Sequence, residues 1–148
     1  VVNAPKARIY GAELEMKARL NQNFSVDSSA TFLHARYVEF SDIDIVTGLD
    51  HDLNGRPLSR ASDFTLNIGA QYDTPIDLGV FSSLSLRGET FHTSTIAYRP
   101  YELGDRESGY WLFNAFLQLN GPDDRYSLRV FGRNLSDKQI SPRFSVAA

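Results

Sequence analysis

The 148-residue sequence contains no cysteine and no apolar run long enough to form a membrane-spanning helix. The absence of cysteine excludes a thiol nucleophile, but it is compatible with both an oxidising periplasm and a reducing cytosol. A membrane-spanning helix needs roughly 20 apolar residues. The nearest candidate, residues 110–119, is interrupted by Asn114 and Gln118. The sequence therefore predicts no membrane-spanning helix.

The sequence also lacks an excess of basic residues, a signal peptide and any recognisable catalytic motif. Fifteen Lys and Arg stand against 18 Asp and Glu, for a net charge of −3, so nucleic acid is not an expected partner. The first residues, Val1 to Lys6, lack a basic start followed by an apolar core, so we expect a mature chain or a fragment. Without a G-x-S-x-G elbow or a phosphate loop, we expect neither enzymatic activity nor a cofactor.

Apolar and polar residues alternate along stretches about twice as long as an average globular strand. In the first stretch, Ala12, Leu14 and Met16 alternate with charged residues, as expected for a strand with one apolar and one polar face. In the second stretch the apolar residues move from even to odd positions after Phe32, which predicts a bulge near that residue. The predicted strands are residues 7–20, 24–37, 64–73, 80–93, 110–119 and 125–135, with a seventh beginning at Ser141.

The order of the connections predicts an all-β, antiparallel up-and-down meander of six or seven long strands. Short turns follow the first, third and fifth strands, whereas long loops, residues 38–62 and 94–108, follow the second and fourth. Outer-membrane barrels have short turns on the periplasmic side and long loops outside. Aromatic residues near the strand ends predict two membrane-interface belts, Tyr10, Tyr37, Phe64, Tyr110 and Trp111 at one rim and Phe24, Tyr72, Phe81 and Tyr126 at the other.

Four short segments, in order along the chain, resemble the last third of TonB-dependent outer-membrane receptors. They are Gly11-Ala12-Glu13-Leu14-Glu15, Gly55-Arg56-Pro57-Leu58 with the strand after it, Gly109-Tyr110-Trp111-Leu112-Phe113-Asn114-Ala115, and Gly132-Arg133-Asn134-Leu135-Ser136-Asp137-Lys138. The residues that carry the family pattern are Gly11, Glu13, Gly109, Tyr110, Asn114, Asn134, Leu135 and Asp137.

The resemblance implies that residues 1–148 are the carboxyl-terminal barrel segment of such a receptor, without its plug domain and amino-terminal strands. The whole barrel would have roughly 22 strands and a plugged lumen. The implied location is the bacterial outer membrane, with lipid and the plug domain as partners and TonB reached only through the missing amino-terminal part. The implied function is energy-coupled uptake of ferric siderophores or similar nutrients.

Two sets of residues follow from this arrangement. The charged and polar residues, which occupy every second position of each strand, are expected to face the lumen. Because their charges are mixed, a ladder of ion pairs is favoured over acid–base catalysis. The predicted lumen-facing residues are Glu13, Glu15, Lys17, Arg19, Thr65, Asn67, Gln71, Arg87, Glu89, Arg129 and Arg133. The long loops are expected to contact a ligand through Asp50, His51, Asp52, Tyr98 and Tyr101.

No metal site is expected. Asp50-x-Asp52-x-Asn54-Gly55 matches the first half of a calcium loop, but Ala61 occupies the position of the bidentate glutamate. A solvated turn is the better interpretation. The three histidines, His34, His51 and His92, have no spacing typical of zinc ligands.

Alternation alone leaves two other function classes open. A small soluble lipocalin-like barrel would turn the same apolar side chains inward to bind a hydrophobic ligand. A soluble β-rich enzyme is the third alternative and ranks last. As an isolated polypeptide, six or seven strands of a large barrel would leave two unpaired edges, which predicts aggregation, oligomerisation or a flattened sheet packed on itself.

Overall fold

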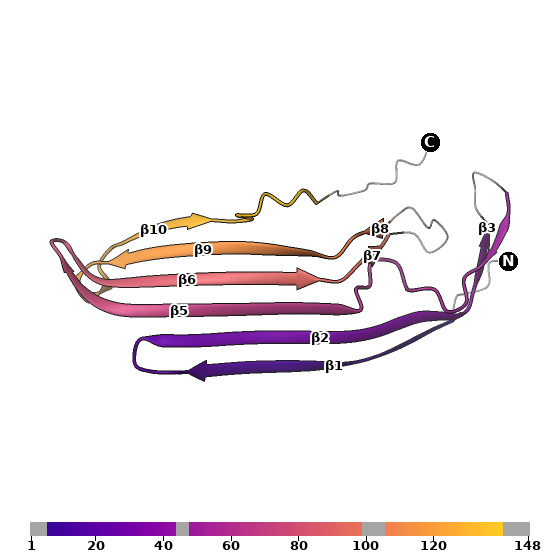
Figure 1. Cartoon of the computed structure of the whole chain (residues 1–148), viewed down its shortest axis with the longest axis horizontal. Coiled ribbons are helices and arrows are strands. Elements are labelled where there is room, and N and C mark those ends of the chain that lie inside the picture. The colour runs from indigo at the N-terminus through magenta and orange to yellow at the C-terminus, as the bar shows by residue number, and fades with distance from the viewer. Residues whose placement is uncertain (1–5, 44–47, 99–105, 141–148) are drawn as a thin grey trace.

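The computed structural model describes residues 6–43, 48–98 and 106–140, and its main element is a single antiparallel sheet (Figure 1). Six strands lie side by side in the order in which they occur along the chain. This arrangement confirms the predicted all-β meander. The strands are β1 (Lys6–Arg19), β2 (Phe24–Glu39), β5 (Phe64–Leu78), β6 (Phe81–Thr93), β9 (Tyr110–Asn120) and β10 (Ser127–Gly132).

The three short turns all lie at one end of the sheet (Figure 1). Between β1 and β2, the Asn21 side-chain oxygen accepts hydrogen bonds from the backbone N–H groups of Asn23 and Phe24, both at 2.8 Å. Gly79 turns the chain between β5 and β6 with a φ of +60°, a conformation that glycine adopts without strain. A single 3₁₀ turn, η1 (Pro122–Asp124), connects β9 to β10.

The two long connections lie at the opposite end and contain short hairpins that the sequence pattern did not reveal. The first connection forms β3 (Ser41–Ile43) and β4 (Asp50–Asp52). The second forms β7 (Ile96–Ala97) and β8 (Arg106–Glu107). Strands of two or three residues are too short to show an alternation, so these segments were predicted only as loops.

Two strand ends differ from the prediction by three residues or more. β5 continues to Leu78, beyond the expected end at residue 73, although Pro75 lies within it. β2 begins at Phe24, opposite Tyr72, and the last backbone hydrogen bond on this side runs from Asp73 N–H to the Asn23 carbonyl at 2.8 Å, so β5 is an edge at Pro75, where proline is tolerated. β10 ends at Gly132 because Asn134 and Asp137 adopt positive φ angles of 50°. The seventh strand predicted from Ser141 lies outside the described residues.

The predicted bulge near Phe32 is wrong. β1 and β2 pair in continuous register from Arg19 to Ala7, and the irregularity lies between Lys6 and Ala7. The change of phase has another cause. β5 begins only at Phe64, opposite Phe32, and the outer part of β2 pairs instead with the long connection, where Tyr37 N–H donates to the carbonyl of Arg56 at 3.0 Å.

Burial is concentrated at the long-loop end. The buried side chains of the described residues are Ala35, Leu53, Thr93 and Ala97, each at most 4% exposed, whereas Leu14 in the middle of β1 is 67% exposed. Among the described residues, β1 and β10 have no partner on their outer edges. The alternative of a lipocalin-like barrel is therefore wrong, because a closed soluble barrel has no open edge and buries the apolar side chains that are exposed here. No described helix is long and apolar enough to span a membrane.

Candidate functional site

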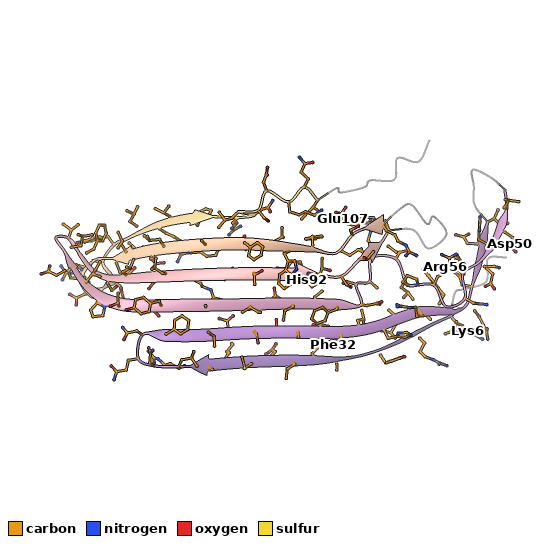
Figure 2. All side chains as sticks on the ribbon, viewed as in Figure 1. Lys6, Phe32, Asp50, Arg56, His92 and Glu107 are labelled. Carbon is orange, nitrogen blue, oxygen red and sulfur yellow. The ribbon has the colours of Figure 1, made fainter. Side chains whose placement is uncertain are left out.

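One face of the sheet is polar across all six strands. Pairing places Glu13 opposite Thr31, Thr31 opposite Thr65, and Thr65 opposite Thr93, and the same parity continues through β9 to Arg129. Arg133 joins this face beyond β10, since its guanidinium lies 5.5 Å from the ring of Phe131. All the residues predicted to face the lumen therefore share one side of the sheet, and Figure 2 shows side chains extending from both faces.

An ion-pair cluster crosses the middle of this polar face. Arg87 of β6 donates to both carboxylate oxygens of Asp27 on β2, at 2.8 and 3.1 Å, and its Nε donates to Glu89 at 2.7 Å. The two partners lie on strands separated by β5, and Gly69 of β5 lies between them. A Cβ at Gly69 would lie 2.4 Å from the Arg87 guanidinium. The glycine therefore leaves the space through which Arg87 reaches Asp27.

A second set of hydrogen bonds connects β6, β9 and β10 nearer the short turns. Arg129 donates through Nε and Nη2 to the Gln118 side-chain oxygen, at 2.9 and 2.5 Å. Gln118 donates to Asn120 at 2.7 Å, and Asn120 donates to Ser83 at 3.2 Å. A concavity of about 360 Å³ lies beside these groups, and its lining residues are Gln71, Ser85, Arg87, Glu89, Phe116, Gln118 and Arg129.

The opposite face is apolar and carries aromatic rings near its long-loop rim. His34 stacks on Tyr10 at 4.7 Å, and His92 stacks on Trp111 at 4.4 Å between ring centroids. Phe64 lies between them, 4.8 Å from Phe32 and 5.9 Å from His92. Two residues assigned to this belt are wrongly placed, because the register puts Tyr37 and Tyr110 on the polar face.

The family-like segments near the end of the chain contact one another. The Asn114 side-chain oxygen accepts a hydrogen bond from the Asn134 backbone N–H at 3.0 Å, and Leu135 N–H donates to the carbonyl of Phe113 at 2.8 Å. Lys138 Nζ lies 5.7 Å from the Tyr110 ring centroid and 3.2 Å from Glu107. The Asp137 N–H closes the turn on the carbonyl of Asn134 at 2.9 Å.

Two of the four glycines that begin family-like segments, Gly11 and Gly109, lie where a neighbouring stretch of backbone approaches closely. A Cβ at Gly11 would lie 2.3 Å from the carbonyl oxygen of Phe32, and one at Gly109 would lie 2.9 Å from that of Thr93. Glu13, two residues beyond Gly11, is exposed on the polar face. The glycines thus serve the packing of the sheet, whereas Glu13 is available to a partner.

At the long-loop end, an ion pair fastens the first connection to β2. Arg36 donates to both carboxylate oxygens of Asp63, at 2.8 and 2.7 Å. These hydrogen bonds hold the pKa of the Asp63 carboxyl below its usual value. The connection also has a buried side chain, Leu53, whose N–H donates to the carbonyl of Phe40 at 2.9 Å.

The residues predicted to contact a ligand belong to two separate hairpins at this end. Asp50, His51 and Asp52 form β4, and Figure 2 shows Asp50 at the end of the molecule opposite the short turns, whereas Tyr98 follows β7. Tyr101 lies outside the described residues. In the calcium-like segment, Asp52 accepts a hydrogen bond from Asn54 N–H at 3.0 Å, and Gly55 has a φ of +74°. Within the described ranges, no three His, Asp or Glu side chains gather as a metal site.

Sequence reasoning missed several residues of the polar face. The sequence pattern does not single out Asp27, the one charged residue between Ser25 and Ala30, or Gly69, a single glycine within a strand. Phe116 and Phe131 were missed because they are aromatic residues at polar positions of the alternation. Phe116 lies two residues from Gln118, and Phe131 lies two residues from Arg129, so each points to the same face as its polar neighbour. This spacing is the signal that could have placed both rings on the polar face.

Comparison with known proteins identifies a family. The model of the family described as TonB dependent receptor-like, beta-barrel matches residues 1–135. The matched range includes every strand of the six-stranded sheet, from Lys6 to Gly132. No curated protein and no solved structure matches the chain significantly.

Proposed function

Because the chain belongs to the TonB-dependent receptor-like β-barrel family, we propose that it forms the carboxyl-terminal sector of a receptor that takes up ferric siderophores or similar nutrients. The family comprises receptors and transporters of the bacterial outer membrane, and it is not a family of enzymes. In this proposal residues 1–148 form one barrel segment, and further strands and a plug domain complete the receptor.

The observation that carries the proposal is the separation of the two faces of the sheet. The polar face, with the Arg87 cluster at its centre, would line the lumen and contact the plug domain. The opposite face, with Leu14, Leu86 and Val130 exposed, would contact the hydrocarbon of the outer membrane. Strands of 11 to 16 residues in β1, β2, β5, β6 and β9 are long enough to cross it, since a tilted transmembrane strand needs about 9–11 residues.

The long connections would face outside and help to receive the ligand. They carry Asp50, His51 and Asp52 on one hairpin and Tyr98 near the other. Ligand transport would depend on TonB, which acts through the amino-terminal part of the receptor. The small-molecule class follows from the family alone, so it is the part of the proposal that needs a direct test.

The proposal is tested in cells that express the chain in its natural gene context. We expect the protein to fractionate with outer membranes, and we expect iron-limited cells to accumulate a labelled ferric siderophore only when TonB is present. A gene deletion provides the control. Unchanged accumulation after deletion, across a panel of hydroxamate, catecholate and carboxylate siderophores, would contradict the substrate class. Recovery of the protein in the soluble fraction would contradict the location.

A further inference from the structure

The concavity near the short turns contains a guanidinium that is held in place but not neutralised. Two N–H groups of Arg129 are bound by Gln118, and Gln118 is fixed in turn by Asn120. An arginine side chain has five N–H donors, so the remaining donors of Arg129 are directed elsewhere. This hydrogen-bond chain orients the guanidinium before any ligand arrives.

Arg129 differs from Arg87, the other cation that lines the concavity. Arg87 contacts the carboxylates of Asp27 and Glu89. Among the residues that the structure describes, no carboxylate lies within ion-pair distance of Arg129. Its partner Gln118 is neutral, so the concavity has a positive charge at this end. Binding an anion there requires no other ion pair to be broken.

An apolar surface adjoins this charge. Phe116 of β9 and Phe131 of β10 are paired in register, next to the Gln118–Arg129 pair, and their ring centroids are 6.3 Å apart. Phe131 is 59% exposed, and Arg133 stacks over its ring at 5.5 Å. Along the polar face of β10, two cations therefore flank an exposed aromatic ring.

We propose that this concavity binds a carboxylate attached to an aromatic or other apolar group. The carboxylate would accept hydrogen bonds from Arg129, and the apolar group would pack on Phe116, which lines the concavity, and on Phe131 beside it. Arginine is suited to this because its planar fork matches a carboxylate. The volume of about 360 Å³ falls at the lower end of the range for small-molecule sites. An acidic side chain of a polypeptide inside the barrel and a small organic acid offer the same chemistry.

This inference rests on the proposed function in one respect, namely that the polar face encloses the lumen. The site is distinct from the ligand contacts proposed at the long loops, because Arg129 lies two residues after the start of β10, near the short turns. It therefore concerns a second binding position, at the opposite end of the strands.

The test measures binding to the intact protein purified in detergent, by calorimetry or ligand-observed NMR. The probes are 3-phenylpropionate with its amide, and the peptide acetyl-Phe-Glu-amide with its Gln counterpart. We expect each acid that binds to do so about tenfold more tightly than its amide, because the neutral amide cannot accept a hydrogen bond from Arg129 as a charged carboxylate does. Arg129→Gln should abolish that preference, and Arg129→Lys should retain part of it.

Arg125→Gln is the matched control. Arg125 lies in the neighbouring turn, 3.9 Å from Asp123, and its loss should leave the acid preference unchanged. Binding of both acids supports a site open to small molecules, and binding of the peptide alone supports a polypeptide segment as the occupant. Equal binding of acids and amides to the native protein, or an unchanged preference in a folded Arg129→Gln variant, would overturn the site. Neither result affects membrane fractionation or siderophore accumulation, which test the proposed function separately.

Discussion

The long-loop end and the six-stranded sheet are stabilised in different ways. All four buried side chains of the described residues, Ala35, Leu53, Thr93 and Ala97, lie at the long-loop end. The strands between the two ends expose side chains on both faces and are held to each other by backbone pairing. The loop end therefore has a small core of its own, whereas the rest of the described sheet has no buried side chain.

The core at the loop end joins the two long connections to each other. Ser62, Ser94 and Thr93 share hydroxyl hydrogen bonds of 2.9 Å, and Arg60 N–H donates to the carbonyl of Ala97 at 2.7 Å. A connection that is bonded both to β2 and to its neighbour is restrained at its base. The two long connections are thus held together at their base.

The largest expected effect comes from emptying the core at the loop end. Leu53→Ala should destabilise that region by about 3 kcal/mol, because a buried leucine is removed and a cavity remains. We expect faster hydrogen exchange at the amides of Gly55 and Leu58, with no change in the middle of β1. Ile43→Ala, at a position 60% exposed on β3, is the matched control. Equal acceleration in both regions would refute the separation of loop core and sheet.

The next effect tests the sheet. Gly11→Ala should cost about 2 kcal/mol, because its Cβ would overlap the Phe32 carbonyl and push β1 away from β2. The measurement is the denaturation midpoint of the protein in detergent. Gly88→Ala is the control, since nothing lies within 4 Å of a Cβ there. A midpoint for Gly11→Ala as high as that of Gly88→Ala would show that the close approach is not required.

A smaller effect is expected from closing the gap under Arg87. Gly69→Ala should cost about 1 kcal/mol, because the guanidinium must move away from Asp27 while its contact with Glu89 can remain. The loss should shrink when the same substitution is made in an Arg87→Gln background, since the displaced contact is already absent. A double-mutant cycle on the denaturation midpoint measures this coupling. Additive costs would show that Gly69 does not act through Arg87.

The smallest effect is a pH dependence confined to the loop end. The folded pKa of Asp63 lies below its ordinary value of 3.8, so the ion pair with Arg36 contributes stability above that pH. The contribution is lost as the pH falls through the folded pKa. Exchange at the Leu33 amide, which donates to the Asp63 carbonyl at 2.9 Å, should therefore accelerate in acid relative to that of Leu14. Asp63→Asn should remove this difference, and its persistence in that variant would assign it to another group.

Much of the fold could be predicted because strand alternation is a local property. Alternation alone predicts that Glu13, Lys17 and Arg129 share one face, and the strand register places them on one side of the sheet. The prediction failed where a segment pairs with a distant, irregular partner. Leu33 and Ala35 contact the first long connection, which lies on the other side of β2 from β1. In the sequence, their change of face looks like a break in the alternation, so it predicts a bulge.

The sequence by itself determined which side chains share a face and at which end the long loops lie, because both depend on the order of residues along one strand or turn. Only the tertiary structure decided which side chains meet. Arg87 reaches Asp27, 60 residues away, because register places Gly69 between them, and Asn114 meets Asn134 because β9 pairs with β10. Register couples distant segments, and no local pattern specifies it.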